Sequence, residues 1–250
     1  MPRKSRETSG TGIYHVMLRG INRQNIFYDI YDYELFLNQL RKLTHPEDER
    51  HQPLPPRCII HAYCLMPNHV HLLLREKEEP LASVMKSIGV AYAWHYNKKF
   101  QHIGPIFQDR FRSEPVNTDA YFFTLMRYIH QNPIKAGLVK EVCEYEWSSW
   151  HEYESTPFIC STKPVTNRMP FEELKALVFE PLPKTTFVLD IDNDKRRRTD
   201  EEVSQLLITE FGLRNPQDVL LLSKERQKDA IRLARDFGAS IRQIERLTIS

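Results

Sequence analysis

The sequence predicts an α+β protein built on one antiparallel sheet, and three observations support this prediction. Short runs of β-branched and aromatic residues alternate with longer runs whose apolar residues recur at helical spacing, up to about residue 153. Two of the β-rich runs are separated only by a proline–asparagine turn, which favours an antiparallel pair. The resulting order of strand, helix, two strands, helix, strand and helix is typical of a sheet with a layer of helices.

The first half of this region predicts three strands and one helix. Residues 13–19, IYHVMLR, are rich in β-forming residues and predict the first strand. Apolar residues recur at helical spacing over 30–43, which predicts a helix, and four prolines make 45–56 a loop. Residues 57–75 hold two apolar runs around the proline–asparagine turn, so they predict a β-hairpin.

The second half predicts two helices and one more strand. An amphipathic helix is expected over 80–99, and a strand is expected within 104–116. Residues 117–119, Asn-Thr-Asp, are a good helix start, and the helix should end near Gln131 because Pro133 follows. The predicted sheet has helices on one face, in the manner of a ferredoxin-like fold, and its other face is open for a ligand.

The pattern changes after the first 154 residues, so a catalytic domain is expected over 1–154. Residues 155–198 contain scattered prolines, end in a run of four basic residues and predict a linker. Residues 199–250 predict a small all-α segment in which two helices flank a glycine turn, the outline of a helix-turn-helix. A recognition helix would be expected to follow Ser250, so this segment is either truncated or a packing element without DNA readout.

Composition sets broad limits on function. Hydrophobic residues make up 41% and charged residues 27% of the chain, which excludes wholesale disorder. The net charge of +2 is weak evidence against a nucleic-acid partner, but it does not exclude a local basic groove. The four cysteines form no C-x-x-C pair, and no segment is apolar enough for a signal peptide or a membrane span. A cytoplasmic protein is therefore expected.

Four residues could carry chemistry. His69 and His71 are two apart on a predicted strand, so their imidazoles leave the same face and suit a divalent metal. Tyr128 and Asn132 are four apart on a predicted helix and share one face, where an amide oxygen could be a third ligand and a phenol could attack a metal-activated phosphate. An isolated H-x-H pair is more often two half-exposed histidines, and an isolated tyrosine is more often a core residue. The context therefore decides.

Three blocks supply that context. AYCLMPNHVHLLL (62–74), FRSEPV (111–116) and RYIHQNPIKAGLV (127–139) resemble, in this order, the HUH single-tyrosine transposases. The resemblance is greatest to the branch associated with repetitive extragenic palindromes, and it covers about residues 12–153. It implies a metal-dependent single-strand DNA endonuclease and strand transferase that acts on hairpin-bearing DNA.

The resemblance also implies roles for individual residues. His69 and His71 would bind the divalent metal, Mg or Mn, and Asn132 would be the third ligand where insertion-sequence members have glutamine. Tyr128 would attack the phosphodiester, form a 5′-phosphotyrosine and release a 3′-hydroxyl. Tyr121, seven residues earlier on nearly the same helix face, is the rival nucleophile.

Contacts with single-stranded DNA are expected from basic and aromatic residues, because arginines track the backbone and aromatic rings stack on bases. The candidates are Arg19, Arg23, Arg110, Arg112, Phe111 and Lys135. The alternative for each is ordinary, with phenylalanine in the core and the cations in solvent.

Two other functions remain open from the sequence. One is a non-catalytic DNA-binding regulator that retains the transposase fold. The other is an unrelated hydrolase that uses a metal-bound water and does not need Tyr128. Insertion-sequence members of the family act as homodimers, whereas the palindrome-associated branch is monomeric, so a monomer is expected here.

Overall fold

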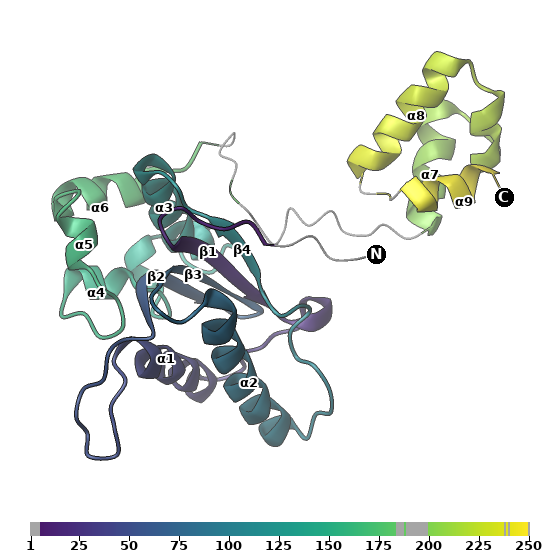
Figure 1. Ribbon diagram of the computed structural model, residues 1–250. Helices are drawn as coiled ribbons and strands as arrows, with labels where there is room; N and C mark the ends of the chain where they lie inside the picture. The colour runs from purple at the N-terminus through teal and green to yellow at the C-terminus, as the bar shows by residue number, and fades with distance from the viewer. Residues whose placement is uncertain (1–5, 184–187, 189–199, 238, 240, 250) are drawn as a thin grey trace. The chain divides into compact units, whose positions relative to one another are not determined.

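The computed structural model describes residues 6–183, 188, 200–237, 239 and 241–249, and the chain divides into two compact units (Figure 1). The first unit is Met1–Leu189 and the second is Asp190–Ser250. The first unit contains the sheet and every residue predicted to take part in chemistry. None of the described helices is both long and apolar enough to cross a membrane.

The sheet lies at the centre of the first unit. Its strands are β1 (Ile13–Arg19), β2 (Cys58–Met66), β3 (His69–Glu76) and β4 (Arg112–Pro115). They lie in the order β2-β3-β1-β4, and every neighbouring pair is antiparallel. β2 and β3 form the predicted hairpin. The α+β class and the antiparallel sheet are therefore confirmed.

Helices cover both faces of this sheet (Figure 1). The long helices are α1 (Ile30–Thr44), α2 (Leu81–Phe100) and α3 (Asp119–Lys135). α1 and α2 share one core cluster with Val16 and Leu72, whereas α3 shares another with Ile13 and Leu73, which lie on the opposite face. The prediction that helices lie on one face only is therefore wrong. Strands such as β2, CIIHAYCLM, are apolar at both alternating sets of positions, and such strands are buried on both faces.

The first unit continues beyond the predicted boundary at residue 154. After α3 come η2 (Val142–Glu144), α4 (Trp150–Glu154), α5 (Lys163–Thr166) and α6 (Phe171–Phe179). Val165, Leu174 and Val178 are buried in the same cluster as the inner face of α3. The prediction of a linker from residue 155 is therefore wrong at its start, because two helices of only four and nine residues give too short a periodic signal. The basic run at 195–198 lies outside the described residues.

The second unit is a small helical bundle. Its elements are α7 (Asp200–Phe211), η3 (Pro216–Leu221), α8 (Lys224–Phe237) and α9 (Ile241–Ile249). Its core includes Val203, Leu207 and Ala230, and Arg246 forms an ion pair with Asp200 at 2.6 Å. The predicted helices are present, but Gly238, the glycine of the predicted turn, lies outside the described residues, and the helix-turn-helix function remains a prediction.

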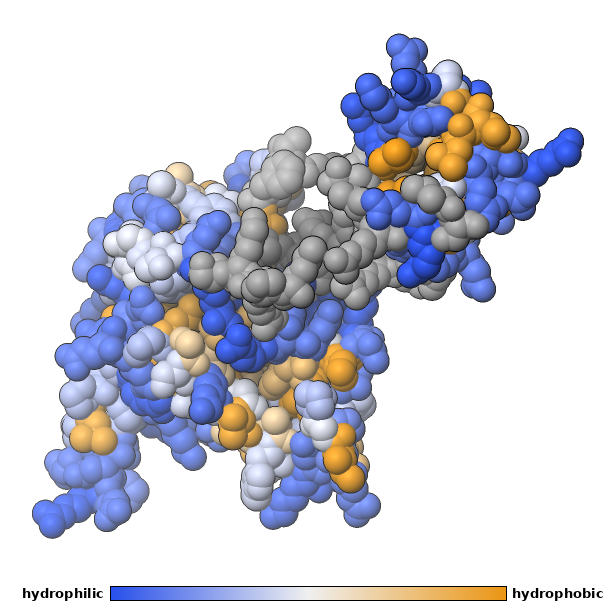
Figure 2. Space-filling model, turned by 45° about the vertical axis from the view of Figure 1, so that its right-hand side comes forward, coloured by the Kyte–Doolittle hydropathy of each residue, from blue (hydrophilic) through white to orange (hydrophobic). Residues whose placement is uncertain are grey.

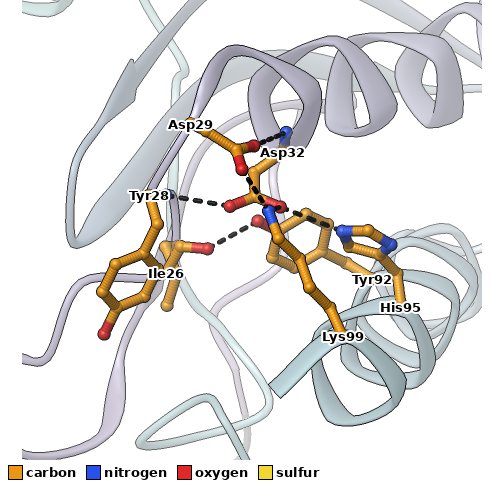
Figure 3. A network of polar contacts seen from close by, with 7 residues as sticks. All are labelled: Ile26, Tyr28, Asp29, Asp32, Tyr92, His95 and Lys99. Atoms are coloured by element: carbon orange, nitrogen blue, oxygen red, sulfur yellow. Dashed lines mark hydrogen bonds and ion pairs between the residues drawn. The ribbon is translucent and has the colours of Figure 1, made fainter.

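A buried carboxylate fixes the segment that connects β1 to α1 (Figure 3). Asp32 is fully buried and accepts hydrogen bonds from the Tyr28 backbone N–H at 2.9 Å, from His95 Nε2 at 3.0 Å and from Lys99 Nζ at 2.6 Å. Burial alone would raise the pKa of Asp32, but these bonds outweigh it and leave that pKa lowered. The Tyr92 hydroxyl donates to the Ile26 carbonyl at 2.5 Å, so α2 holds the same segment.

The fixed segment in turn holds the turn before β3. The backbone N–H groups of Ile26 and Phe27 donate to the Pro67 carbonyl at 2.8 and 3.1 Å, and Gly20 N–H donates to the Asn68 carbonyl at 2.9 Å. Gly20 is needed here because a Cβ at that position would lie 2.2 Å from the carbonyl oxygen of Gln24. The short helix η1 (Ile21–Arg23) lies between Gly20 and Gln24. These bonds position the residue that follows the turn, which is His69.

The surface of the first unit carries hydrophobic residues in scattered positions among hydrophilic ones (Figure 2). The exposed hydrophobic residues include Val90, Trp94 and Ile103. Scattered exposure of this kind is normal for a folded protein.

Candidate active site

His69 and His71 lie at the start of β3 and face α3. His69 is the first residue of the strand and is half-buried, whereas His71 is fully buried. Their ring centroids are 4.9 Å apart. Since Leu73 on the same face packs in the cluster with α3, both imidazoles point towards the helix that carries Tyr128.

Tyr128 lies on the inner face of α3 and meets the histidines. Its ring contacts the His71 ring edge-on, with centroids 5.5 Å apart, and is 6% exposed. α3 begins at the Thr118 cap, whose side chain accepts from Tyr121 N–H, and runs to Lys135 rather than to Gln131 as predicted. The helix continues through Pro133, which only lacks the N–H that would bond to the Ile129 carbonyl, and the Ala136 N–H closes the last turn by donating to the Asn132 carbonyl at 2.9 Å.

Asn132 lies one turn after Tyr128 and is also buried. Its Nδ2 donates to the Tyr128 carbonyl at 3.0 Å, so the amide is tied to the helix that carries the tyrosine. The ammonium group of Lys135 lies 5.6 Å from the centre of the Tyr128 ring. The fold thus places the predicted residues on two facing elements, with His69 and His71 on β3 and Tyr128 and Asn132 on α3.

His15 on β1 joins this cluster, although the sequence analysis did not select it. Its ring stacks on His71 with centroids 5.2 Å apart and lies 5.9 Å from the Tyr128 ring. His15 Nε2 is 3.0 Å from His71 Nδ1, and His15 Nδ1 is 2.8 Å from Glu114 Oε1 on β4. Glu114 is directly opposite His15 in the sheet and accepts a hydrogen bond from the Tyr121 hydroxyl at 2.6 Å. A histidine within the apolar strand IYHVMLR was the available signal, but only the strand register shows what it contacts.

The electrostatics of the cluster keep His71 neutral. Burial, together with the charges of His69, His15 and Lys135, lowers the pKa of His71 well below its usual value. Its Nε2 atom is buried and has no hydrogen-bond partner among the described residues. Buried polar nitrogens are rarely left in this state, and a neutral imidazole nitrogen is a common metal ligand.

The histidines of the cluster could supply only some of the ligands that a divalent metal needs. Within the described ranges, no group of three or more His, Cys, Asp or Glu side chains is arranged to hold a metal ion. A metal at His71 Nε2 would therefore need oxygen ligands, from the Asn132 amide, from water or from a substrate phosphate. Imidazole nitrogen combined with oxygen ligands suits Mn²⁺, and Mg²⁺ is accommodated where oxygens dominate.

The residues predicted to contact DNA lie on different elements of the first unit. Arg19 is opposite His69 in the sheet, and Arg112 shares a face of β4 with Glu114 beside the cluster. Arg23, the last residue of η1, and Arg110, in the loop before β4, are both exposed, and each follows one of the two residues of the Gly20–Phe107 bridge. Lys135 is exposed and is the last residue of α3, the helix that carries Tyr128. The four arginines therefore gather at the end of the sheet where His69 lies.

Phe111 is not available for base stacking. It is 6% exposed, packs in the core with α1 and α2, and has the Arg6 guanidinium 3.8 Å from its ring centre. The prediction that it binds DNA is therefore corrected. The sequence pattern of a phenylalanine between two arginines does not distinguish a core residue from an exposed one.

The fold and the cluster define a transposase-type domain, in which a sheet presents a pair of histidines to a tyrosine on the facing helix. Residues 9–132 match the family model described as "Transposase IS200 like". The first unit of the chain belongs to this family.

Two known proteins are similar to this chain. One is a protein of Haemophilus influenzae named "Putative REP-associated tyrosine transposase", which is 28% identical over 102 residues. The match covers 36% of this chain and 57% of that protein, so the chain spans somewhat more than half the length of this relative. The other is a solved structure of a REP-associated tyrosine transposase bound to a REP hairpin, with 18% identity and a TM-score of 0.49, covering 62% of this chain and 87% of that one.

Proposed function

We propose that the first unit is a metal-dependent single-strand DNA endonuclease and strand transferase that acts on hairpin-bearing DNA through Tyr128. The observation that carries this proposal is the contact between the Tyr128 ring and His71, a buried neutral imidazole whose Nε2 is unpartnered among the described residues. Membership of the transposase family supports a DNA substrate.

The proposed reaction is a transesterification. The Tyr128 hydroxyl oxygen bonds to phosphorus, the bond from phosphorus to the 3′-oxygen breaks, and the phenolic proton leaves to solvent while the 3′-oxygen takes one up. The products are a 5′-phosphotyrosine and a free 3′-hydroxyl, which can attack in reverse to rejoin a strand. A bound divalent metal would polarise the scissile phosphate and neutralise its developing charge.

Each residue of the cluster has a defined part in this proposal. His69 and His71 would hold the metal, and Asn132 would contribute its amide oxygen. The burial of Tyr128 excludes bulk water from the side of the ring that faces the sheet. The nearby Lys135 ammonium favours the phenolate and the phosphate, both of which are negative.

DNA would approach from the end of the sheet where the arginines gather. Arg19 and Arg112 lie beside the cluster, and Arg23 and Arg110 extend the positive charge into the adjoining loops. Contacts to phosphates supply affinity without sequence selection. A monomer is proposed on the basis of the resemblance to the palindrome-associated branch, and gel filtration with light scattering would test it.

The test is covalent trapping. Labelled single-stranded hairpin oligonucleotides from the DNA that flanks the gene are mixed with the protein and Mg²⁺ or Mn²⁺, and then denatured. The expected result is an adduct that requires metal, disappears on chelation, is absent in Tyr128→Phe and persists in the matched control Tyr31→Phe, whose ring is exposed. Calorimetric titration with MnCl₂ should show binding by wild type and by Tyr128→Phe but none by His71→Ala.

Other outcomes would contradict the proposal in different ways. Cleavage at a normal rate by Tyr128→Phe, without any adduct, would indicate attack by a metal-bound water. Hairpin binding without cleavage by a protein that does bind Mn²⁺ would favour the non-catalytic regulator.

A further inference from the structure

A chain of hydrogen bonds runs from α3 through the sheet to the back of His71. The Tyr121 hydroxyl donates to Glu114 Oε1 at 2.6 Å, and the same oxygen lies 2.8 Å from His15 Nδ1. His15 Nε2 lies 3.0 Å from His71 Nδ1. The chain ends at His71 Nε2, on the far side of the ring.

The chemistry of each group fixes the direction of this chain. A carboxylate oxygen only accepts, so His15 donates from Nδ1. A neutral imidazole carries one N–H, so His15 Nε2 is an acceptor and receives the hydrogen bond that His71 Nδ1–H donates. His71 then has its lone pair at Nε2, the atom that has no partner among the described residues.

We propose that Glu114 and His15 are positioning residues that hold His71 in the tautomer with a lone pair at Nε2, and that Tyr121 holds Glu114 for this purpose. The part that concerns metal affinity rests on the proposed function. A ligating histidine commonly donates its other N–H to an oriented partner, which fixes its tautomer and ring orientation and strengthens it as a ligand. Here the partner is a second histidine backed by a carboxylate.

The opposite arrangement is disfavoured by the surroundings. It requires a doubly protonated His15 that donates to both neighbours, and an N–H at His71 Nε2. That N–H would be a buried donor without an acceptor among the described residues.

The same chain gives Tyr121 a role other than nucleophile. Its hydroxyl group donates its hydrogen to Glu114 and lies at the end of the hydrogen-bond chain far from His71. The Tyr128 ring, in contrast, contacts His71 directly. Tyr121→Phe should therefore still form the covalent adduct at saturating Mn²⁺, whereas Tyr128→Phe should form none at any Mn²⁺ concentration.

The direct test is nuclear magnetic resonance of the full chain labelled with ¹⁵N-histidine and free of metal. Two-bond ¹H–¹⁵N correlations distinguish the two tautomers, and the His15→Gln and His71→Gln spectra assign the signals. The expected result is an N–H at Nδ1 in both residues. An N–H at Nε2 of His71, or a doubly protonated His15 at neutral pH, would overturn the inference even if no Glu114 variant could be purified.

A second measurement tests the consequence for metal binding. Mn²⁺ affinity, measured by calorimetry, should fall about 10- to 100-fold in Glu114→Leu and by less in Glu114→Gln, whose amide oxygen can still accept from His15. Glu78→Gln, on an exposed glutamate of the same unit, is the matched control and should bind as wild type does. Equal affinity in Glu114→Leu and wild type would overturn the inference.

The two proposals can fail separately. A wild-type protein that shows the expected tautomers but binds no Mn²⁺ would refute the metal-dependent function and leave the tautomer assignment intact. If the wild-type protein binds Mn²⁺ and forms the adduct but His71 has the other tautomer, only the proposed role of Glu114 and His15 is refuted.

Discussion

His61 should make the first unit sensitive to mild acid. This histidine lies on β2, is 4% exposed, and contacts the Phe122 ring edge-on at 5.3 Å. Its Nδ1 has no hydrogen-bond partner among the described residues. Burial lowers the pKa of His61 from 6.5 to about 4, against a smaller opposing effect of the Ser161 backbone.

The sign and the size of the effect follow from which state binds the proton. Below pH 6.5 the unfolded chain protonates His61 while the folded protein does not, so the free energy of unfolding falls as the pH falls, until about pH 4. With these two pKa values, integration from pH 7 to pH 5 gives a loss of about 2 kcal/mol in the free energy of unfolding. A loss of this size is a substantial part of the stability of a typical domain.

The assay is urea unfolding at pH 7, 6 and 5, followed by tryptophan fluorescence, because all three tryptophans lie in the first unit. His61→Leu removes the titrating group and keeps an apolar side chain in the site. Wild type should lose about 2 kcal/mol more than this variant between pH 7 and pH 5. His51→Asn, at an exposed histidine whose positive φ asparagine tolerates, is the control and should lose as much as wild type.

A parallel loss of stability in wild type and His61→Leu would refute the reasoning. A constant difference between them would mean that folded His61 takes up its proton at the same pH as the unfolded chain. Its burial would then not exclude the charge.

Three further substitutions test how the first unit is held together. Gly20→Ala should destabilise it by about 1–3 kcal/mol in thermal unfolding, because the new Cβ would meet the Gln24 carbonyl, and an unchanged Tm would show that the loop adapts. Glu152→Ala should cost about 3 kcal/mol or more in urea unfolding, because one buried carboxylate oxygen accepts from three consecutive backbone N–H groups at 2.7–2.8 Å; a loss below about 1 kcal/mol would mean that water replaces it. Asp32→Asn should cost about 1–3 kcal/mol at pH 7 and progressively less as the pH falls below the ordinary carboxyl range, since the pKa of Asp32 is lowered in the folded state; an equal cost at low pH would contradict the ion pair with Lys99.

The sequence predicts the first part of the cluster well because its signals are local. A period of two on a strand places His69 and His71 on one face, and a period of 3.6 on a helix places Asn132 beside Tyr128. Both patterns need only the type of secondary structure to be right. The α+β class was predictable on the same grounds, from the alternation of short and long apolar segments.

The second part of the cluster is not local. His15 meets Glu114 because β1 and β4 pair in one register, and it meets His71 diagonally across β1 and β3. β4 is only four residues long, RSEP, and nothing in that sequence specifies its partner or register. The second layer of helices could not be predicted for the same reason, because the apolar periodicity of a helix does not specify which face of the sheet the helix covers.

The two histidines proposed as metal ligands differ in how firmly the fold holds them. His71 lies inside the sheet between two strands, so moving it requires the sheet itself to separate. His69 is the first residue of its strand, and its position depends on a turn that three backbone hydrogen bonds tie to the β1–α1 connection. His69 also pairs with Arg19 and Met66, but at the very end of the ladder, so fraying at that end would free His69 before His71. Under the proposed function, the metal would have one histidine ligand of fixed geometry and one that can yield, so its coordination could adjust as a DNA strand enters and leaves while His71 Nε2 stays in place.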